Sequence, residues 1–300
     1  EMANFPYAIP GDTAQWALPK NAGGFKVRGH SRAGERTGFM LMDVGICFDA
    51  GLSNWAVPRY ILVSHSHTDH SFALPMMVTA QPRAPKVFAP PEAVPFLERH
   101  VIATAQLNEC SMEHGEVQGC EIMALAVGET VRVGAKGRRL LATAVRCPHR
   151  VPSIGFCIDE QKDKLLKQYL SLTGPEIGAM KRAGEVITET VTEKKMVFMG
   201  DTTIDVFALH PEVLQYPLIF IECTFWTEGL QKKAHERGHI HWDSLKPYVK
   251  QNPDTVFVLI HFTLRFSEKD IEDFFRAESA AEEITNLALW LDQGVIQFFK

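Results

Sequence analysis

The stretch ILVSHSHTDHSFALP (residues 61–75) places three histidines and one aspartate within six positions, directly after a short apolar run. Imidazole nitrogens and carboxylate oxygens are the donors that Zn²⁺ takes in proteins. In an extended segment, His65 and His67 are two positions apart and can point to the same side. Asp69 and His70 then face a second point, so this one cluster could serve two metal ions.

Four further donor residues stand at or near the ends of apolar runs along the chain. Asp201 follows MVFMG, Glu222 follows LIFI, His261 follows VFVLI, and His149 stands near the end of ATAVRCP. Strand ends in layered sheets converge on a common rim, so these side chains can meet there. We expect three of them to complete the shells of the two metals, with Asp201 as the bridging ligand: His149, Asp201 and His261.

The donor set consists of nitrogen and carboxylate ligands without thiolates, which favours Zn²⁺ and leaves Mn²⁺ as the alternative. A single His-x-His pair would be a weak signal, because a solvated pair of loop histidines explains it equally well. The longer H-x-H-x-D-H pattern after an apolar strand, with three downstream donors, is a strong signal.

The segments that must position these side chains alternate between strand and helix patterns, which is typical of an α/β fold. We find no linker, so we expect one domain over residues 1–300, in which residues 1–25 form a loosely attached lead-in. The polar stretch 159–184 reads as helical, and Ser267 with Asp270 forms a capping box before a helix. The predicted strands are 39–51, 60–63, 86–90, 121–144, 196–201, 217–225 and 255–263, and the other predicted helices are 90–106, 241–252 and 267–291.

The composition, with 46% hydrophobic and 22% charged residues, is that of an ordinary soluble globular protein. A net charge of −5 argues against a surface that is basic all over, but a basic patch can still bind RNA. The clusters KGRR (136–139), KDKLLK (162–167) and QKK (231–233) either face RNA or form ordinary solvated surface.

The six cysteines include no C-x-x-C pair, which makes a disulfide scaffold improbable in a chain of 300 residues. The first residues lack the basic and apolar regions of a signal peptide, and no apolar run approaches the ~20 residues of a membrane span. We therefore expect a protein of a reducing compartment, the cytoplasm, with the nucleus as the alternative.

These motifs, taken together, resemble the metallo-β-lactamase superfamily and, more narrowly, the tRNase Z family in its plant-type short form. The resemblance rests on the first histidine motif and on HFTLRF (261–266), ECTF (222–225) and GHIH (238–241), with the motif order intact. It implies a four-layer αββα sandwich, two Zn²⁺ ions and removal of the 3′ trailer from precursor tRNA. It also implies a homodimer. The protruding arm of bacterial relatives is not evident, and residues 159–184 resemble a shorter substrate-binding insert.

The resemblance also implies roles for individual residues. Asp69 would orient the attacking water in addition to binding metal. His239 would be the general acid, with its ring held by the Glu222 carboxylate. Thr263 and Arg265 would contact phosphate, for which the planar guanidinium group is well suited.

Each of these residues also has a possible structural explanation that involves no catalysis. Glu222 could merely bind a backbone N–H, Thr263 and Arg265 could belong to an ordinary charged surface, and His241 is expected to be structural. Two other functions also stay open. One is hydrolysis of a small phosphodiester or ester by the same fold. The other is metal-dependent RNA binding without catalysis, suggested by Ser71–Ala73 standing in place of glycines.

Overall fold

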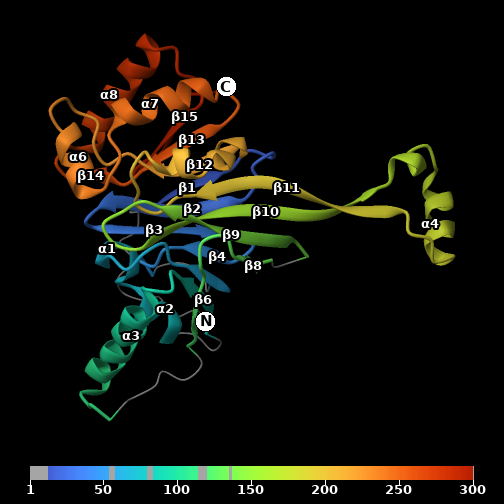
Figure 1. Cartoon of the computed structure of the whole chain (residues 1–300), viewed down its shortest axis with the longest axis horizontal. Helices are drawn as coiled ribbons and strands as arrows, with labels where there is room; N and C mark the ends of the chain where they lie inside the picture. The colour runs from blue at the N-terminus through green and yellow to red at the C-terminus, as the bar shows by residue number, and fades with distance from the viewer. Residues whose placement is uncertain (1–12, 54–57, 80–83, 114–119, 135–136, 300) are drawn as a thin grey trace.

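Two eight-stranded sheets lie face to face in the computed structural model, and helices cover their outer faces (Figure 1). The structure describes residues 13–53, 58–79, 84–113, 120–134 and 137–299. Helices α1 (Thr68–Ser71), α2 (Leu74–Thr79) and α3 (Val94–Glu109) belong to the first half of the chain. The second half contributes α5 (Val206–Leu209), η2 (Pro211–Gln215), α6 (Gln231–Arg237), α7 (Trp242–Gln251) and α8 (Glu268–Ala281). The four-layer α/β sandwich expected from the sequence is confirmed.

The first sheet is built almost entirely by the N-terminal part of the chain. Its spatial order is β1-β2-β3-β4-β5-β6-β7, and β14 adds to it by pairing in parallel with β2. From β4 onward, the pairs β4–β5, β5–β6 and β6–β7 are all parallel, so the carboxyl ends of these strands share one edge. The strands are β1 (Ala14–Ala17), β2 (Lys26–Ala33), β3 (Arg36–Leu41), β4 (Ile46–Phe48), β5 (Tyr60–Leu62), β6 (Lys86–Ala89), β7 (Ile122–Ala124) and β14 (Phe262–Thr263).

The second sheet has the spatial order β16-β15-β13-β12-β11-β10-β9-β8. Its centre is parallel from β11 through β12 and β13 to β15. The carboxyl ends of β11, β12 and β13 therefore also lie along one edge. The strands are β8 (Thr130–Arg132), β9 (Arg139–Cys147), β10 (Ser153–Leu165), β11 (Thr188–Phe198), β12 (Leu218–Glu222), β13 (Val256–Ile260), β15 (Leu287–Leu291) and β16 (Gly294–Gln297).

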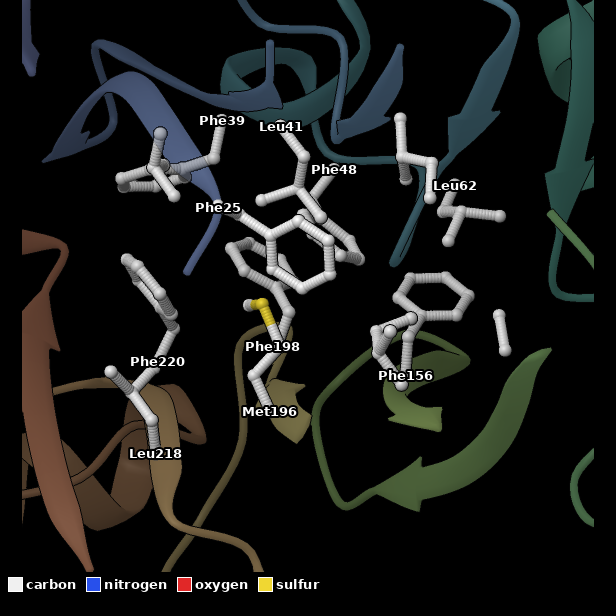
Figure 2. Packing of buried hydrophobic residues seen from close by; sticks show 14 of the residues in the cluster. Phe25, Phe39, Leu41, Phe48, Leu62, Phe156, Met196, Phe198, Leu218 and Phe220 are labelled. Atoms are coloured by element: carbon white, nitrogen blue, oxygen red, sulfur yellow. The ribbon is translucent and has the colours of Figure 1, made fainter. Parts of the chain in front are cut away.

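The core between the sheets is aromatic. Alternate side chains of a strand point to opposite faces, so Phe198 and Phe220 face the first sheet, whereas their neighbours pack under the helices. Phe48 stacks on Phe198 with ring centroids 4.8 Å apart, and Phe39 lies 5.3 Å from Phe220 and 5.0 Å from Trp290. Figure 2 shows the phenylalanines of the two sheets meeting at this interface. This packing fixes the distance between the two edges that carry the polar residues.

Phe39 is the residue whose loss should destabilise this interface most. Phe39→Ala is expected to lower the free energy of unfolding by about 3–5 kcal/mol, because it removes a buried ring and leaves a cavity. Urea denaturation followed by circular dichroism measures the change. Phe96→Ala is the control, because that ring is 65% exposed and should cost less than about 0.5 kcal/mol. Equal midpoints for the two variants would contradict the prediction.

A two-stranded arm leaves the second sheet. Strands β10 and β11 remain paired as far as Leu165 and Thr188, and α4 (Gly174–Arg182) lies at the end of the arm (Figure 1). The expectation that residues 159–184 are helical is therefore wrong for the first part of this range, which belongs to β10. Only η1 (Lys167–Tyr169) and α4 are helical there. The helix α4 begins with a capping box formed by Thr173 and Glu176.

Side-chain pairs between β10 and β11 hold the two strands of the arm together. The sequence of residues 159–165 alone does not reveal these pairs. Lys162 lies 3.2 Å from Glu193, and Thr190 donates a hydrogen bond of 2.8 Å to Asp163. The opposite strand is rich in β-branched threonine and valine, which favours a strand in both. Two arginines of the predicted basic cluster at 136–139 are paired with carboxylates of β10, since Arg138 pairs with Glu160 and Arg139 with Asp163.

Two other predictions also need correction. Residues 14–17 pair with β2, and Leu18, Ala22 and Phe25 are buried, so residues 13–25 are not a loose lead-in; residues 1–12 lie outside the described part. The capping box of α8 is confirmed, but the helix ends at Ala281. The stretch LALWL is strand β15, because it is buried on both faces and pairs in parallel with β13.

Within the described segments, no helix is both long enough and apolar enough to cross a bilayer.

Candidate metal centre and active site

The facing edges of the two sheets bring all seven predicted metal ligands together. The loop after β5 carries His65 and His67, and α1 carries Asp69 and His70. In the second sheet, the segments after β9, β11 and β13 present the remaining three residues. The donor atoms form groups whose members all lie within 4.8 Å of one another: His65, His67, His149 and Asp201; Asp69, His70 and His261; and Asp201, His239 and His261.

Asp201 lies between the two histidine groups. Its Oδ2 is 3.7 Å from His65 Nε2 and 3.9 Å from His149 Nε2, on one side. Its Oδ1 is 3.3 Å from His70 Nε2 and 3.5 Å from His261 Nε2, on the other. One carboxylate thus presents one oxygen to each group, which is the arrangement that a bridging ligand requires.

Partners outside the cluster fix the orientation of four imidazole rings. Asp49 Oδ2 lies 2.7 Å from His70 Nδ1, and the Gly238 carbonyl lies 2.7 Å from His149 Nδ1. Each acceptor takes a hydrogen bond from the Nδ1–H group, so the Nε2 atom faces the cluster. Ser64 and Thr224 do the same for His65 and His261, because each hydroxyl donates to a carboxylate and accepts from Nδ1.

Asp49, Thr224 and Gly34 support the donor residues but were not predicted from the sequence. Asp49 also accepts hydrogen bonds from the backbone N–H and the hydroxyl of Ser64. Gly34 donates its backbone N–H to Asp69 Oδ2 at 2.8 Å. A signal for Asp49 was present, since ICFDAG is an apolar strand followed by a carboxylate, the same pattern that identified Asp201.

Burial and neighbouring charges shift the pKa values of the cluster residues. Burial lowers the pKa of His65, His67 and His149, so their rings are neutral at pH 7 and can act as ligands. Burial acts against the charge of His70 as well, but Asp201 and Asp49 outweigh it and raise the pKa of His70 well above its usual range. Despite its burial, Asp201 has a pKa well below the ordinary value, because His261 and His70 stabilise its charge.

The close approach of the histidine nitrogens shows whether the cluster can accommodate a metal ion. Ring nitrogens face each other closely, with 3.1 Å between His65 Nε2 and His67 Nδ1 and 3.3 Å between His70 Nε2 and His261 Nε2. The lone pairs of two such nitrogens repel unless a proton or cation lies between them. Imidazole and carboxylate donors with ordered outer partners are what a metal site provides. The cluster therefore fits metal binding.

A second arrangement adjoins the cluster. His239 Nδ1 lies 2.8 Å from Glu222 Oε1, and Glu222 also accepts from the backbone N–H groups of Thr202 and Ile240. Burial by itself would lower the pKa of His239, but the Glu222 carboxylate more than offsets this and raises it to about 9. Both readings of Glu222 thus apply, since it binds backbone N–H groups and holds the His239 ring.

The predicted substrate residues lie just beyond His261. Thr263 is buried, and its N–H donates to the Thr224 carbonyl. Arg265 is exposed and forms no ion pair with any described residue, so its guanidinium group is available to a ligand.

His241 is structural, as expected, because its ring accepts the Asp243 N–H at the start of α7. Burial raises the pKa of the Cys147 and Cys223 thiols, which suits small buried apolar residues.

The fold and the donor groups define a protein of the β-lactamase superfamily, and residues 51–262 match the family described as beta-lactamase superfamily domain. Within it the chain belongs to the ribonuclease Z family. It is 31% identical over 175 residues to nuclear ribonuclease Z of Triticum aestivum, a match that covers 56% of this chain and 94% of that protein. It is also 27% identical over 259 residues to tRNase Z TRZ1 of Arabidopsis thaliana, covering 83% and 89% of the two chains.

Solved structures share the fold at low sequence identity. Human tRNase Z, short form, superimposes with a TM-score of 0.50 at 17% identity, covering 96% of this chain and 97% of that one. The metallo-β-lactamase fold protein YhfI of Bacillus subtilis gives a TM-score of 0.54 at 14% identity, over 89% and 97% of the two chains. These structures show the shared fold, and the sequence relatives and the matching family confirm the family resemblance found in the sequence.

Proposed function

We propose that this chain is an endoribonuclease that removes the 3′ trailer from precursor tRNA by hydrolysing one phosphodiester bond. The observation that carries the proposal is the joint presence of two donor groups with Asp201 between them and of the Glu222–His239 pair beside them. Membership of the ribonuclease Z family supports the choice of an RNA substrate.

We assign two Zn²⁺ ions to the donor groups, with Mn²⁺ as the alternative. His65, His67, His149 and Asp201 would hold one ion, and Asp69, His70, His261 and Asp201 the other. When bound, a pair of such ions lowers the pKa of water and neutralises charge on phosphate oxygens. The donor set contains no thiolate, which suits both metals.

The chain's own groups supply the remaining steps. The Asp69 carboxylate accepts a hydrogen bond from the attacking water and orients it toward phosphorus. His239, with Nδ1 bound to Glu222, presents its Nε2–H to the departing 3′ oxygen and donates the proton. The tRNA then ends in a 3′ hydroxyl, and the trailer carries a 5′ phosphate. Thr263 and Arg265 bind phosphate oxygens of the RNA next to the cut.

The pH dependence follows from the Glu222–His239 pair. A general acid works only while it is protonated, so cleavage should persist up to a pH of about 9 and fall as the pH rises further. Glu222→Gln removes the negative charge that contributes most to the raised pKa of His239, and only Asp201 then still opposes the effect of burial. The descending limb of the pH profile of kcat is expected to move toward the ordinary value of 6.5. An unmoved limb would contradict the assignment of His239 as the acid.

The arm formed by β10, α4 and β11 is our candidate for the surface that binds the body of the tRNA. It projects away from the sandwich (Figure 1), and α4 has no buried side chain, so its surface is available to a partner. Recognition of this kind depends on backbone and shape more than on base sequence. We further propose a homodimer located in the cytoplasm.

Incubation with a precursor tRNA that carries a labelled 3′ trailer tests the function. One cut at the trailer junction is expected, with a 3′ hydroxyl on the tRNA product. Turnover of bis-p-nitrophenyl phosphate at pH 7 is measured beside it. Equal turnover without trailer removal would support a small-phosphodiester hydrolase instead, and binding of tRNA by the metal-loaded protein without any cut would support a non-catalytic role.

A further inference from the structure

The tip of the β2–β3 hairpin (residues 32–36) contacts one member of a donor group and the segment that follows another. Gly34 donates its N–H to Asp69 Oδ2 at 2.8 Å. Arg32 donates to three backbone carbonyls of the segment that follows His261. These are Phe262 O at 3.3 Å, Thr263 O at 3.2 Å and Phe266 O at 2.9 Å. Both contacts concern the group formed by Asp69, His70 and His261.

Besides Arg32, the segment after His261 is held by the Thr263 N–H, which donates to the Thr224 carbonyl, and by the buried ring of Phe262. His261 itself has a positive φ of 63°, which a non-glycine residue adopts only where the surroundings hold it. The strand β14 that follows is two residues long, and it pairs with β2 directly at Arg32 and Ala33. A planar guanidinium group with several N–H donors can satisfy three carbonyls at once, whereas a lysine ammonium group on a flexible stem cannot hold that geometry.

The charge of Arg32 is balanced within the fold, which keeps the side chain in place. Arg32 is buried, and α8 and the β15–β16 turn bring Glu268 and Asp292 near it. Burial raises the pKa of Glu268, and Arg32 offsets part of this rise. Burial acts on Asp292 in the same direction, but His30 and Arg32 hold the pKa of Asp292 below its ordinary value.

We propose that Arg32 is a positioning residue that sets the affinity of the Asp69/His70/His261 group for its metal ion without touching the ion. The hydrogen bonds of its guanidinium group to the described residues all go to the segment after His261, so its loss releases that ligand and leaves His65, His67 and His149 in place. One metal position then depends on a support, Arg32, that the other position does not have. The inference rests on the proposed function, in which both positions are occupied during cleavage.

The test compares Arg32→Lys and Arg32→Gln with Arg138→Lys. Arg138 is a matched control because it also donates to a backbone carbonyl, that of Gly23 at 3.0 Å, and pairs with the Glu160 carboxylate, and neither partner belongs to the metal cluster. Metal-free protein is titrated with Zn²⁺ against a chromophoric chelator. Both Arg32 variants are expected to bind one equivalent at least about tenfold more weakly, with the other unchanged. The control should bind both equivalents as the unaltered protein does.

Kinetics supply a second readout. Loss of one ion should lower kcat for precursor tRNA while KM stays the same, and a higher Zn²⁺ or Mn²⁺ concentration should restore kcat. The proposal is overturned if both Arg32 variants bind both equivalents normally, or if both lose the two ions together with their circular dichroism signal, because Arg32 would then support the whole fold. Failure of the unaltered protein to bind two ions or to cut precursor tRNA would instead refute the proposed function.

Discussion

Asp201→Asn is expected to abolish cleavage of precursor tRNA while the protein stays folded. The side chain presents Oδ1 to His70 and His261 and Oδ2 to His65 and His149, so a single change removes negative charge from both donor groups. Metal ions stabilise the transition state of phosphodiester hydrolysis by several kcal/mol. Since 1.36 kcal/mol corresponds to a factor of ten, the rate should fall by about a thousandfold or more.

Asp205→Asn is the matched control for this variant. Asp205 lies four positions further along the same loop, is exposed and accepts a hydrogen bond from the Thr203 hydroxyl. It should retain full activity and its metal content. Elemental analysis and single-turnover cleavage are measured on both variants. Normal metal content together with normal cleavage in Asp201→Asn would refute the bridging role.

His239→Ala should have the second largest effect, and the effect should depend on the leaving group. A positioned general acid contributes about 10²–10⁴ in rate when the leaving oxygen needs a proton. The 3′ oxygen of a ribose needs one, whereas p-nitrophenolate leaves without it. Cleavage of precursor tRNA should therefore fall by that factor, and turnover of bis-p-nitrophenyl phosphate should change little.

The same variant decides between two roles for His239, because its ring also lies near Asp201 and His261. As an acid, its loss leaves the metal content unchanged; as a ligand, its loss removes metal and reduces both activities together. His235→Ala is the control, since that histidine lies exposed on α6 in the same part of the chain. An equal loss with both substrates, together with loss of metal, would refute the assignment as acid.

The donor residues could be predicted from the sequence because they obey a local rule. Each of Asp201, Glu222 and His261 follows an apolar run, and parallel strands end at one edge whatever the rest of the fold does. The supporting residues follow no such rule. Thr224 is important only because three other residues, Glu222, His239 and His261, converge on its hydroxyl group.

The arm shows the opposite case, in which local pattern misled. The stretch from Asp159 to Leu165 is polar and lysine-rich, so it reads as a solvated helix. Its strand structure comes from pairing with residues 188–194, which lie more than twenty positions away along the chain. Likewise, the sequence LALWL continues the helical pattern of α8. It forms a strand because it is buried between β13 and β16.

The division of the donors between the two sheets has a consequence for biosynthesis. The first four, residues 65–70, emerge from the ribosome early, but His261 comes almost two hundred residues later and belongs to the opposite layer. An ion coordinated by both would act as a staple across the sandwich, and it can be acquired only after the layers have docked. Nascent or incompletely folded chains would therefore be harmless to cellular RNA, and loading of the ions would mark the final step of maturation.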